Sequence, residues 1–409
     1  AFVVVICVTV FIVMAICIPR YRKVQKATDK INLAARENLT GINVVHAFNA
    51  EDYQNEKFDK PSKEMFGLQI KNQKAFALVN PTMTLGMNGL TLVIYWLGAA
   101  LVNNIPAANV SGRIAFFSEV LAFSTYATYI VMSFMMLVMI FMMLPQAQVS
   151  AERINEVLST EPSIKGGVVE KSEEEGTVEF RNVSFRYKDS TEDELSGINF
   201  KVEKGKTLAI IGATGSGKTT LVNLIPRTYD ATQGEVLVDG VNVKDYTQKA
   251  LLDKIGFVTQ KATLFSGTIK DNVFFGESKT DYDDADLSEA LEASQASEFV
   301  DKLPEKSEHK IAQLGRNVSG GQKQRISIAR ALARKPEILV FDDSFSALDY
   351  RTDARLRKEL NEKFKGVTKI IVAQRVSTIR HADEILVLDR GETVGRGTHD
   401  ELIESCGIY

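Results

Sequence analysis

Long apolar runs occupy much of the first third of the 409-residue chain and predict membrane-spanning helices. Residues 1–18 are apolar except for one threonine, and residues 75–102 and 120–144 carry no charged side chain. Each run is long enough to cross the hydrocarbon core of a bilayer as an α-helix. We therefore expect an all-α transmembrane region with three spans within residues 1–149, so that the lipid bilayer is a partner of the chain.

The segment 19–74, between the first two spans, is charged and has a helical pattern on both sides of Leu39-Thr40-Gly41. Residues 20–74 carry 11 Lys+Arg and 7 Asp+Glu, whereas residues 103–119 carry one of each. The positive-inside rule places the 19–74 segment in the cytoplasm. Two legs of roughly 20 residues would reach about 30 Å beyond the membrane. They are either a lever toward another domain or a solvated helical hairpin.

The pattern changes after residue 150. Residues 150–175 are charged, contain Pro162 and Gly166-Gly167, and predict a linker. Short apolar runs then alternate with helical patterns through residues 176–409, which indicates an α/β domain with a mostly parallel sheet. The expected strands are 178–185, 207–211, 235–238, 255–259, 338–341, 368–373 and 384–388, and the clearest helical patterns are 218–225 and 321–333.

Composition supports this division and excludes several classes of protein. All 10 methionines precede residue 150, and residues 1–150 carry 12 Lys+Arg against 8 Asp+Glu, whereas residues 151–409 carry 37 against 44. A wholly soluble enzyme, a disordered chain and a basic nucleic-acid binder are excluded, so no nucleic-acid partner is expected. The 3 cysteines form no CxxC pair, which argues against a zinc site or a disulfide framework.

The motif Gly212-Ala-Thr-Gly-Ser-Gly-Lys-Thr219 follows an apolar strand and opens a helix, which is the setting of a phosphate-binding loop. Glycines let backbone N–H groups surround phosphate oxygens, and the helix N-terminus adds positive potential. The lysine places a charge on the β- and γ-phosphates, and the hydroxyl of Thr219 ligates Mg²⁺. The candidate ATP-binding residues here are Gly212, Thr214, Gly215, Ser216, Gly217, Lys218, Thr219 and Thr220.

A second strand, 338–341, ends in the carboxylate of Asp342. An acid at this place can hold the Mg²⁺ that accompanies a nucleotide bound by the loop. A surface aspartate after a buried strand is the alternative, but the phosphate-binding loop requires such a partner. We therefore predict ATP and Mg²⁺ as cofactors.

Further motifs resemble those of ATP-binding cassette (ABC) transporters over residues 176–409. Val318-Ser-Gly-Gly-Gln322 resembles their signature, Ser344-Phe-Ser-Ala-Leu-Asp349 their D-loop, and Phe257-Val-Thr-Gln260 their Q-loop, while Tyr187 matches the aromatic residue that stacks on adenine. Residues 37–48 resemble the coupling helix of ABC exporters, and residues 150–156 resemble the joint between their last helix and nucleotide domain.

The resemblance implies a half-transporter in which the three spans are the last three of six helices. It places the chain in the cell membrane as a multi-pass protein with a cytoplasmic nucleotide domain, paired with a second half-transporter. Gln260 is implied as a further Mg²⁺ ligand. The signature residues Ser319, Gly320, Gly321 and Gln322 would contact ATP on the partner chain, and the D-loop comprises Ser346, Ala347, Leu348 and Asp349.

Two implied catalytic positions depart from the family pattern. Asp343 stands where the family has glutamate, and Gln374 stands where it has histidine. A carboxylate set back by about 1 Å can cost on the order of 100-fold in rate, and glutamine cannot become a cation.

Since the signature is intact, we expect a heterodimeric exporter in which this chain carries the slow ATP site. A homodimeric exporter with slow hydrolysis and a non-transporting, ATP-gated regulator are the alternatives. The methionines and phenylalanines of the last span favour a lipophilic substrate.

Overall fold

The computed structural model describes residues 2–276 and 282–409, which form two compact units. The first unit ends at Glu161, and the regular secondary structure among its described residues is all helical. The second begins at Pro162 and combines sheets with helices. The predicted fold class, a helical transmembrane domain followed by an α/β domain, is therefore confirmed.

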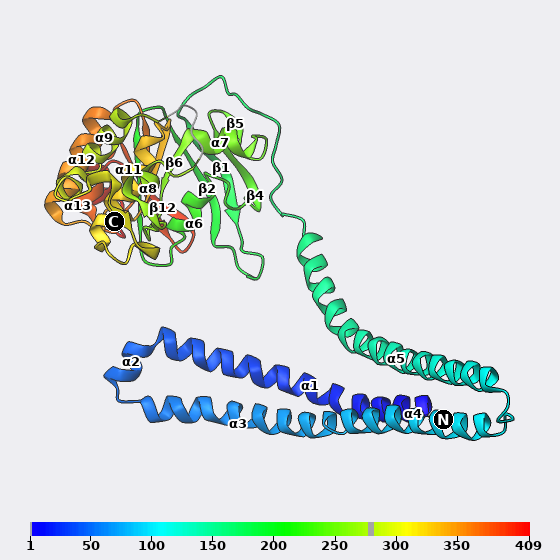
Figure 1. Cartoon of the computed structure of the whole chain (residues 1–409). Helices are drawn as coiled ribbons and strands as arrows, with labels where there is room; N and C mark the ends of the chain where they lie inside the picture. Colours follow the sequence, from blue (N-terminus) through cyan, green and yellow to red (C-terminus); the bar gives the residue numbers. More distant parts are fainter. Residues whose placement is uncertain (1, 277–281) are drawn as a thin grey trace. The chain divides into compact units, whose positions relative to one another are not determined.

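The helical unit contains α1 (Phe2–Thr40), α2 (Ile42–Ala47), α3 (Glu51–Phe76), α4 (Val79–Asn103) and α5 (Val110–Leu158). In Figure 1, α1 and α3 lie side by side as two long legs joined through α2. Among the described residues, 51–103 and 110–134 contain helices long and apolar enough to cross a membrane. The span predicted at 1–18 forms the first part of α1, although residue 1 itself lies outside the described residues.

Two helix boundaries differ from the sequence-based expectation. Helix α5 continues to Leu158, so the first nine residues of the predicted linker are helical. This stretch holds no glycine or proline, and the amide of Gln148 donates to Glu152 at 3.1 Å one turn away, which supports a helix. The predicted tight turn at Gly41 is followed by the short helix α2, in which Val44 and Val45 donate their backbone N–H groups to the carbonyl of Gly41.

The second unit contains two main sheets. Strands of the larger sheet have the order β12-β11-β3-β10-β9-β6, and all its pairings except β11 with β12 are parallel. The smaller sheet, with the order β2-β1-β4-β5, is antiparallel. The strands are β1 (Val178–Phe185), β2 (Leu195–Val202), β3 (Thr207–Gly212), β4 (Gln233–Val238), β5 (Val241–Asn242), β6 (Ile255–Val258), β7 (Gly267–Thr268), β8 (Lys310–Ile311), β9 (Ile338–Asp342), β10 (Thr368–Val372), β11 (Glu384–Asp389) and β12 (Glu392–Gly397).

The predicted mostly parallel sheet is thus present, but the separate antiparallel sheet was not predicted. The expected strands 178–185 and 235–238 pair with each other rather than with the parallel strands. The helices of this unit are α6 (Lys218–Asn223), α7 (Gln248–Lys254), α8 (Ile269–Val273), α9 (Asp284–Ala293), α10 (Ser297–Val300), α11 (Gly320–Ala333), α12 (Tyr350–Lys363), α13 (Val376–Ile379) and α14 (His399–Ser405).

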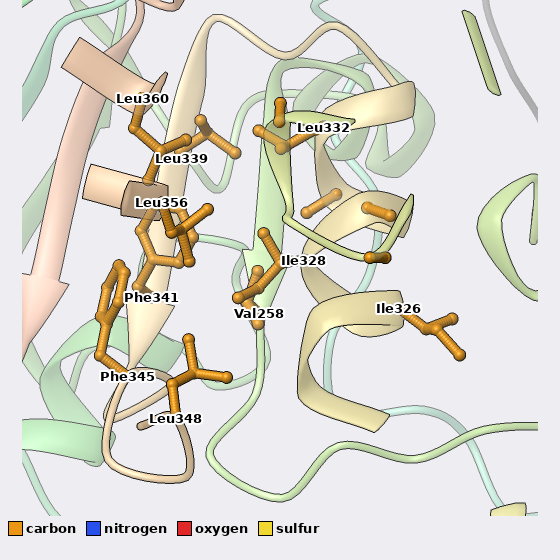
Figure 2. Close-up of a cluster of buried hydrophobic side chains, with 14 of the residues drawn as sticks. Val258, Ile326, Ile328, Leu332, Leu339, Phe341, Phe345, Leu348, Leu356 and Leu360 are labelled. Carbon is orange, nitrogen blue, oxygen red and sulfur yellow. The ribbon is translucent and has the colours of Figure 1, made fainter. Parts of the chain in front are cut away.

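Strand β9 is buried on both faces and organises the core. Leu339 and Phe341 point toward helices α11 and α12, where Figure 2 shows them near Ile328, Leu356 and Leu360. Ile338 and Val340 alternate with them and pack on the opposite face, against the side of the core that contains α6 and the antiparallel sheet. This burial explains why β9 reads as a continuous apolar run in the sequence.

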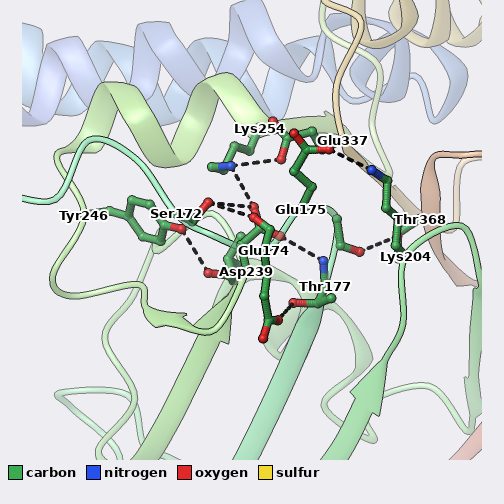
Figure 3. Close-up of polar contacts among 12 residues, drawn as sticks. Ser172, Glu174, Glu175, Thr177, Lys204, Asp239, Tyr246, Lys254, Glu337 and Thr368 are labelled. Carbon is green, nitrogen blue, oxygen red and sulfur yellow. Dashed lines mark hydrogen bonds and ion pairs between the residues drawn. The ribbon is translucent and has the colours of Figure 1, made fainter.

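A polar network attaches the linker to the α/β unit (Figure 3). The Lys254 ammonium donates to Asp239 at 2.7 Å and to Glu337 at 2.9 Å. Asp239 also accepts the backbone N–H of Thr177 at 2.8 Å, and Ser172 of the linker donates to it at 3.4 Å. The linker is therefore ordered against the domain through one buried carboxylate.

Candidate functional site

Strand β3 and helix α6 are joined by the predicted phosphate-binding loop. Gly215 and Gly217 have φ of 82° and 90°, a left-handed conformation that favours glycine. A Cβ atom at Gly217 would lie 2.7 Å from the side chain of Leu195, so this position also lacks space. A loop of this conformation directly before a helix is the backbone arrangement that a phosphate cradle requires.

The ammonium of Lys218 lies beneath this loop. Its Nζ donates to the backbone carbonyls of Gly212 at 2.8 Å and Ala213 at 2.6 Å, and to the hydroxyl of Ser216 at 3.3 Å. Burial lowers the pKa of Lys218, and the charges of Asp343 and Asp342 oppose that shift in part. When a nucleotide binds, its phosphate oxygens would accept hydrogen bonds from Lys218 in place of these carbonyls. Because the phosphate oxygens are anionic, those hydrogen bonds would be stronger.

Thr219 and Asp342 meet at the place expected for Mg²⁺. The hydroxyl of Thr219 donates to a carboxylate oxygen of Asp342 at 3.0 Å. Ligands about 2.1 Å from an octahedral Mg²⁺ are about 3 Å apart along each edge, so this pair of hard oxygen atoms fits the ion. Burial raises the pKa of Asp342, and the hydrogen bond from Thr219 opposes the shift. Mg²⁺, when bound with nucleotide, would neutralise this carboxylate and the phosphates.

Asp343 receives two side-chain amides at one oxygen atom. Its Oδ2 accepts Gln260 at 3.2 Å and Gln374 at 2.8 Å. The three residues follow the carboxyl ends of β6, β9 and β10, which are adjacent in the parallel sheet. Asp343 has φ of 46° and donates its backbone N–H to Val372 at 3.1 Å. The parallel sheet therefore brings Asp343 and Gln374, the two residues that depart from the family pattern, into one hydrogen-bonded group.

A pocket at this edge of the sheet brings most of the predicted residues together. It is lined by Glu194, Thr214, Gly215, Gly217, Lys218, Thr219, Thr220, Gln260, Asp342, Asp343, Val372 and Gln374. Gly212 and Ser216 lie under the loop as acceptors for Lys218 instead. Glu194 was not predicted, because the hairpin between β1 and β2 brings it to the pocket and no sequence motif marks it.

Tyr187 lies beside the loop. Its hydroxyl is 3.0 Å from that of Thr220, and its ring contacts Phe185 and Tyr229 edge to face. About a third of Tyr187 remains exposed (37%), which leaves ring surface for a base. This arrangement is compatible with adenine stacking beside the phosphates, as the sequence predicts.

The signature and D-loop residues do not line this pocket. Ser319 is the N-cap of α11, and it forms a capping box with Gln322. Gly320 faces open space, since a Cβ atom there would meet nothing within 4 Å. Asp349 caps α12 by accepting the backbone N–H of Thr352 at 3.0 Å, and Ser346 donates to the backbone carbonyl of Asp343 at 2.8 Å. Ala347 approaches Gly321 through its carbonyl oxygen, and Leu348 is buried in the core.

Comparison with known proteins agrees with both units. The sequence model of the ABC transporter transmembrane region matches residues 1–134, and that of the ABC transporter matches residues 195–346. The chain is 38% identical over 398 residues to an uncharacterized ABC transporter ATP-binding protein of Mycobacterium bovis, covering 96% of this chain and 66% of that protein.

Two further proteins similar to this chain are a flippase and an exporter of known structure. An ATP-dependent lipid A-core flippase of Aromatoleum aromaticum is 35% identical over 388 residues, which cover 95% of this chain and 63% of the flippase. A bacterial Atm1-family ABC exporter, whose structure was solved with ATP bound, superimposes with a TM-score of 0.84 at 26% identity, over 100% of this chain and 70% of the exporter. The chain spans slightly less than two thirds of the length of the Mycobacterium bovis and Aromatoleum aromaticum proteins.

Proposed function

Because this chain belongs to the ABC transporter family, with a transmembrane region fused to an ATP-binding domain, we propose that it drives export of a lipophilic substrate across the cell membrane. We propose further that it works as one half of a heterodimer. Its own ATP site is the slow one, and its signature, Ser319 to Gln322, completes the competent site on the partner chain.

The arrangement around Asp343 carries the proposal. Its carboxylate is one methylene shorter than the family's glutamate, and Gln260 and Gln374 both hold the same oxygen. A general base needs a free lone pair within hydrogen-bond reach of the attacking water. Both amides bind Oδ2 and leave the lone pairs of Oδ1 free, so the weakness of Asp343 as a base is its shorter reach toward the attacking water. Gln374 has no positive charge with which to stabilise the transferred phosphate.

ATP and Mg²⁺ binding are nevertheless supported by the same site. The loop glycines, the buried ammonium of Lys218 and the oxygen pair of Thr219 and Asp342 are all in place. We therefore expect the site to retain nucleotide while hydrolysing it slowly. The partner chain is expected to carry glutamate and histidine at the corresponding positions, together with an altered signature.

Two observations support a lipophilic substrate. The lipid A-core flippase is named for a lipid substrate, and it is similar to this chain over most of the chain's length. In α5, the side chains of Met132, Met136, Met139 and Met143 are each more than half exposed within the chain. Flexible, polarizable methionines adapt to apolar ligands of varied shape.

The first test is Mg·ATP hydrolysis by the purified full-length protein, alone and then with a second half-transporter. The proposal expects negligible turnover alone and clear turnover in the pair. Comparable turnover by the chain alone would instead show that Asp343 and Gln374 suffice for hydrolysis, and the homodimeric exporter would replace the heterodimer.

A substitution provides an independent check of the slow site. Asp343→Glu combined with Gln374→His should raise ATP hydrolysis by the chain alone on the order of 100-fold, since it restores the reach of the base and a cationic side chain. A high rate before substitution that the double change leaves unaltered would contradict the proposal.

A further inference from the structure

A second cleft in the α/β unit lies at the amino ends of β3 and β10, away from the carboxyl-end residues that line the nucleotide pocket. Helices α12 and α13 form its sides, and its volume is about 290 Å³. That volume is at the lower end of the range for small-molecule sites. We call it the α12 cleft. Its apolar surface comes from Leu360, Ile371 and Ile379 together with small side chains.

The charged groups of the cleft have one sign. Arg357, Lys358 and Lys369 line it, and the described residues that line it include no aspartate or glutamate. Arg357 is balanced by Asp353, which accepts it through both carboxylate oxygens at 2.9 and 3.1 Å. Lys358 is exposed, and its nearest carboxylate, Glu362, is 3.9 Å away.

Lys369 is the most informative of these residues. It is 3% exposed, and among the described residues its ammonium has one acceptor, the carbonyl oxygen of Val367 at 3.3 Å. The carboxylate whose charge acts on Lys369 is that of Asp383. Its two oxygens already accept hydrogen bonds from Lys206 at 2.9 Å and from the backbone N–H of Thr207 at 2.8 Å. A buried cation with so few partners costs free energy, because it gives up hydration without gaining a counter-ion.

An anion in the cleft would supply that counter-ion. Burial lowers the pKa of Lys369 and the charge of Asp383 only partly opposes this. A phosphate or carboxylate beside the ammonium would favour its charged form and accept the N–H groups that remain. The apolar floor would simultaneously cover a small hydrophobic body attached to the acid group.

We propose that the α12 cleft is a binding site for small organic anions, in which Lys369 and Lys358 bind the acid group and the apolar floor binds the rest. The occupant would lie between α12, whose N-cap is the D-loop residue Asp349, and α13, which begins two residues after Gln374. The site is separate from the nucleotide pocket, and the proposal does not depend on the chain's transport activity.

Phenyl phosphate is a suitable probe for the full-length protein in lipid nanodiscs. Its affinity is measured by saturation-transfer NMR on the ring protons, with phenol as the uncharged control and benzoate as the carboxylate counterpart. We expect phenyl phosphate to bind more tightly than phenol. Lys369→Met, which keeps an apolar stem, should weaken binding about tenfold or more. Lys365→Met, an exposed lysine outside the cleft, is the matched control and should leave the affinity unchanged.

Two more variants keep the test decisive. Ala354→Phe adds bulk at an exposed position of the cleft and should block the probe without removing a charge, even if Lys369→Met fails to fold. Lys218→Ala disables the nucleotide loop and should leave probe binding intact. Equal binding of phenol and phenyl phosphate would overturn the proposal, as would binding that survives both Lys369→Met and Ala354→Phe. Binding lost only in Lys218→Ala would assign the probe to the nucleotide pocket instead.

Discussion

At the residue scale, the buried ammonium of Lys218 has one structural and one functional role. It holds the carbonyls of Gly212 and Ala213, and it would contact nucleotide phosphates. Lys218→Ala removes charge-assisted hydrogen bonds that are each worth about tenfold or more in affinity. We expect ATP affinity to fall by about 100-fold, measured with a fluorescent ATP analogue. Lys188→Ala, an exposed lysine outside the pocket, should change the affinity less than twofold.

Substitutions of Tyr187 can separate the contributions of its ring and of its hydroxyl to ATP binding. Its ring would stack on adenine, whereas its hydroxyl lies 3.0 Å from that of Thr220. Loss of a stacked ring costs about 1–3 kcal/mol per base in proteins that use this contact. We expect Tyr187→Ala to weaken ATP binding about 5- to 100-fold and Tyr187→Phe to weaken it far less. If Phe and Ala reduced the affinity equally, the hydroxyl rather than the ring would be the important group.

At the element scale, Lys254 joins the linker to both sheets. Its partners are Asp239, which follows β4, and Glu337, which precedes β9, and the side chain of Asp239 is fully buried. Removing one member of a buried ion pair costs about 3–5 kcal/mol. Lys254→Met should therefore lower the thermal midpoint of this domain by about 6–20 °C. Circular dichroism of the full chain measures this shift.

A second lysine of the same network provides the control. Lys204 pairs with Glu175 at 2.7 Å, but more than half of each side chain is exposed. Solvent screens such a pair, so Lys204→Met should shift the midpoint much less than Lys254→Met. Equal shifts in the two variants would contradict a special role for the buried network.

Local sequence patterns predict those elements whose motif lies within one continuous stretch of the sequence. The strand, loop and helix around Lys218 are contiguous, and the same is true of β9 and Asp342. The meeting of Gln260, Asp343 and Gln374 required the order of β6, β9 and β10 in the sheet, which hydrophobic patterns do not specify and the family resemblance supplied. Glu194 was missed because no motif marks the connection between β1 and β2, and the antiparallel sheet was missed because it needs the long-range pairing of β1 with β4. Lys369 is buried with a single carbonyl acceptor among the described residues, and its neighbours in sequence do not reveal this either.

At the scale of the whole molecule, the proposed heterodimer predicts different effects for mutations at two places in this chain. One is its own ATP site, and the other is the signature that it contributes to the partner's site. In the pair, Asp343→Asn affects only the slow site and should reduce steady-state ATP hydrolysis less than about threefold. Gly320→Glu should reduce it on the order of 100-fold, because it places a negative charge in the signature that serves the partner's nucleotide. The fold tolerates this change, since a Cβ atom at Gly320 meets nothing within 4 Å. Comparing both variants at matched expression measures the asymmetry. Equal losses would mean that both sites hydrolyse ATP, and the homodimeric exporter would then account for the chain better.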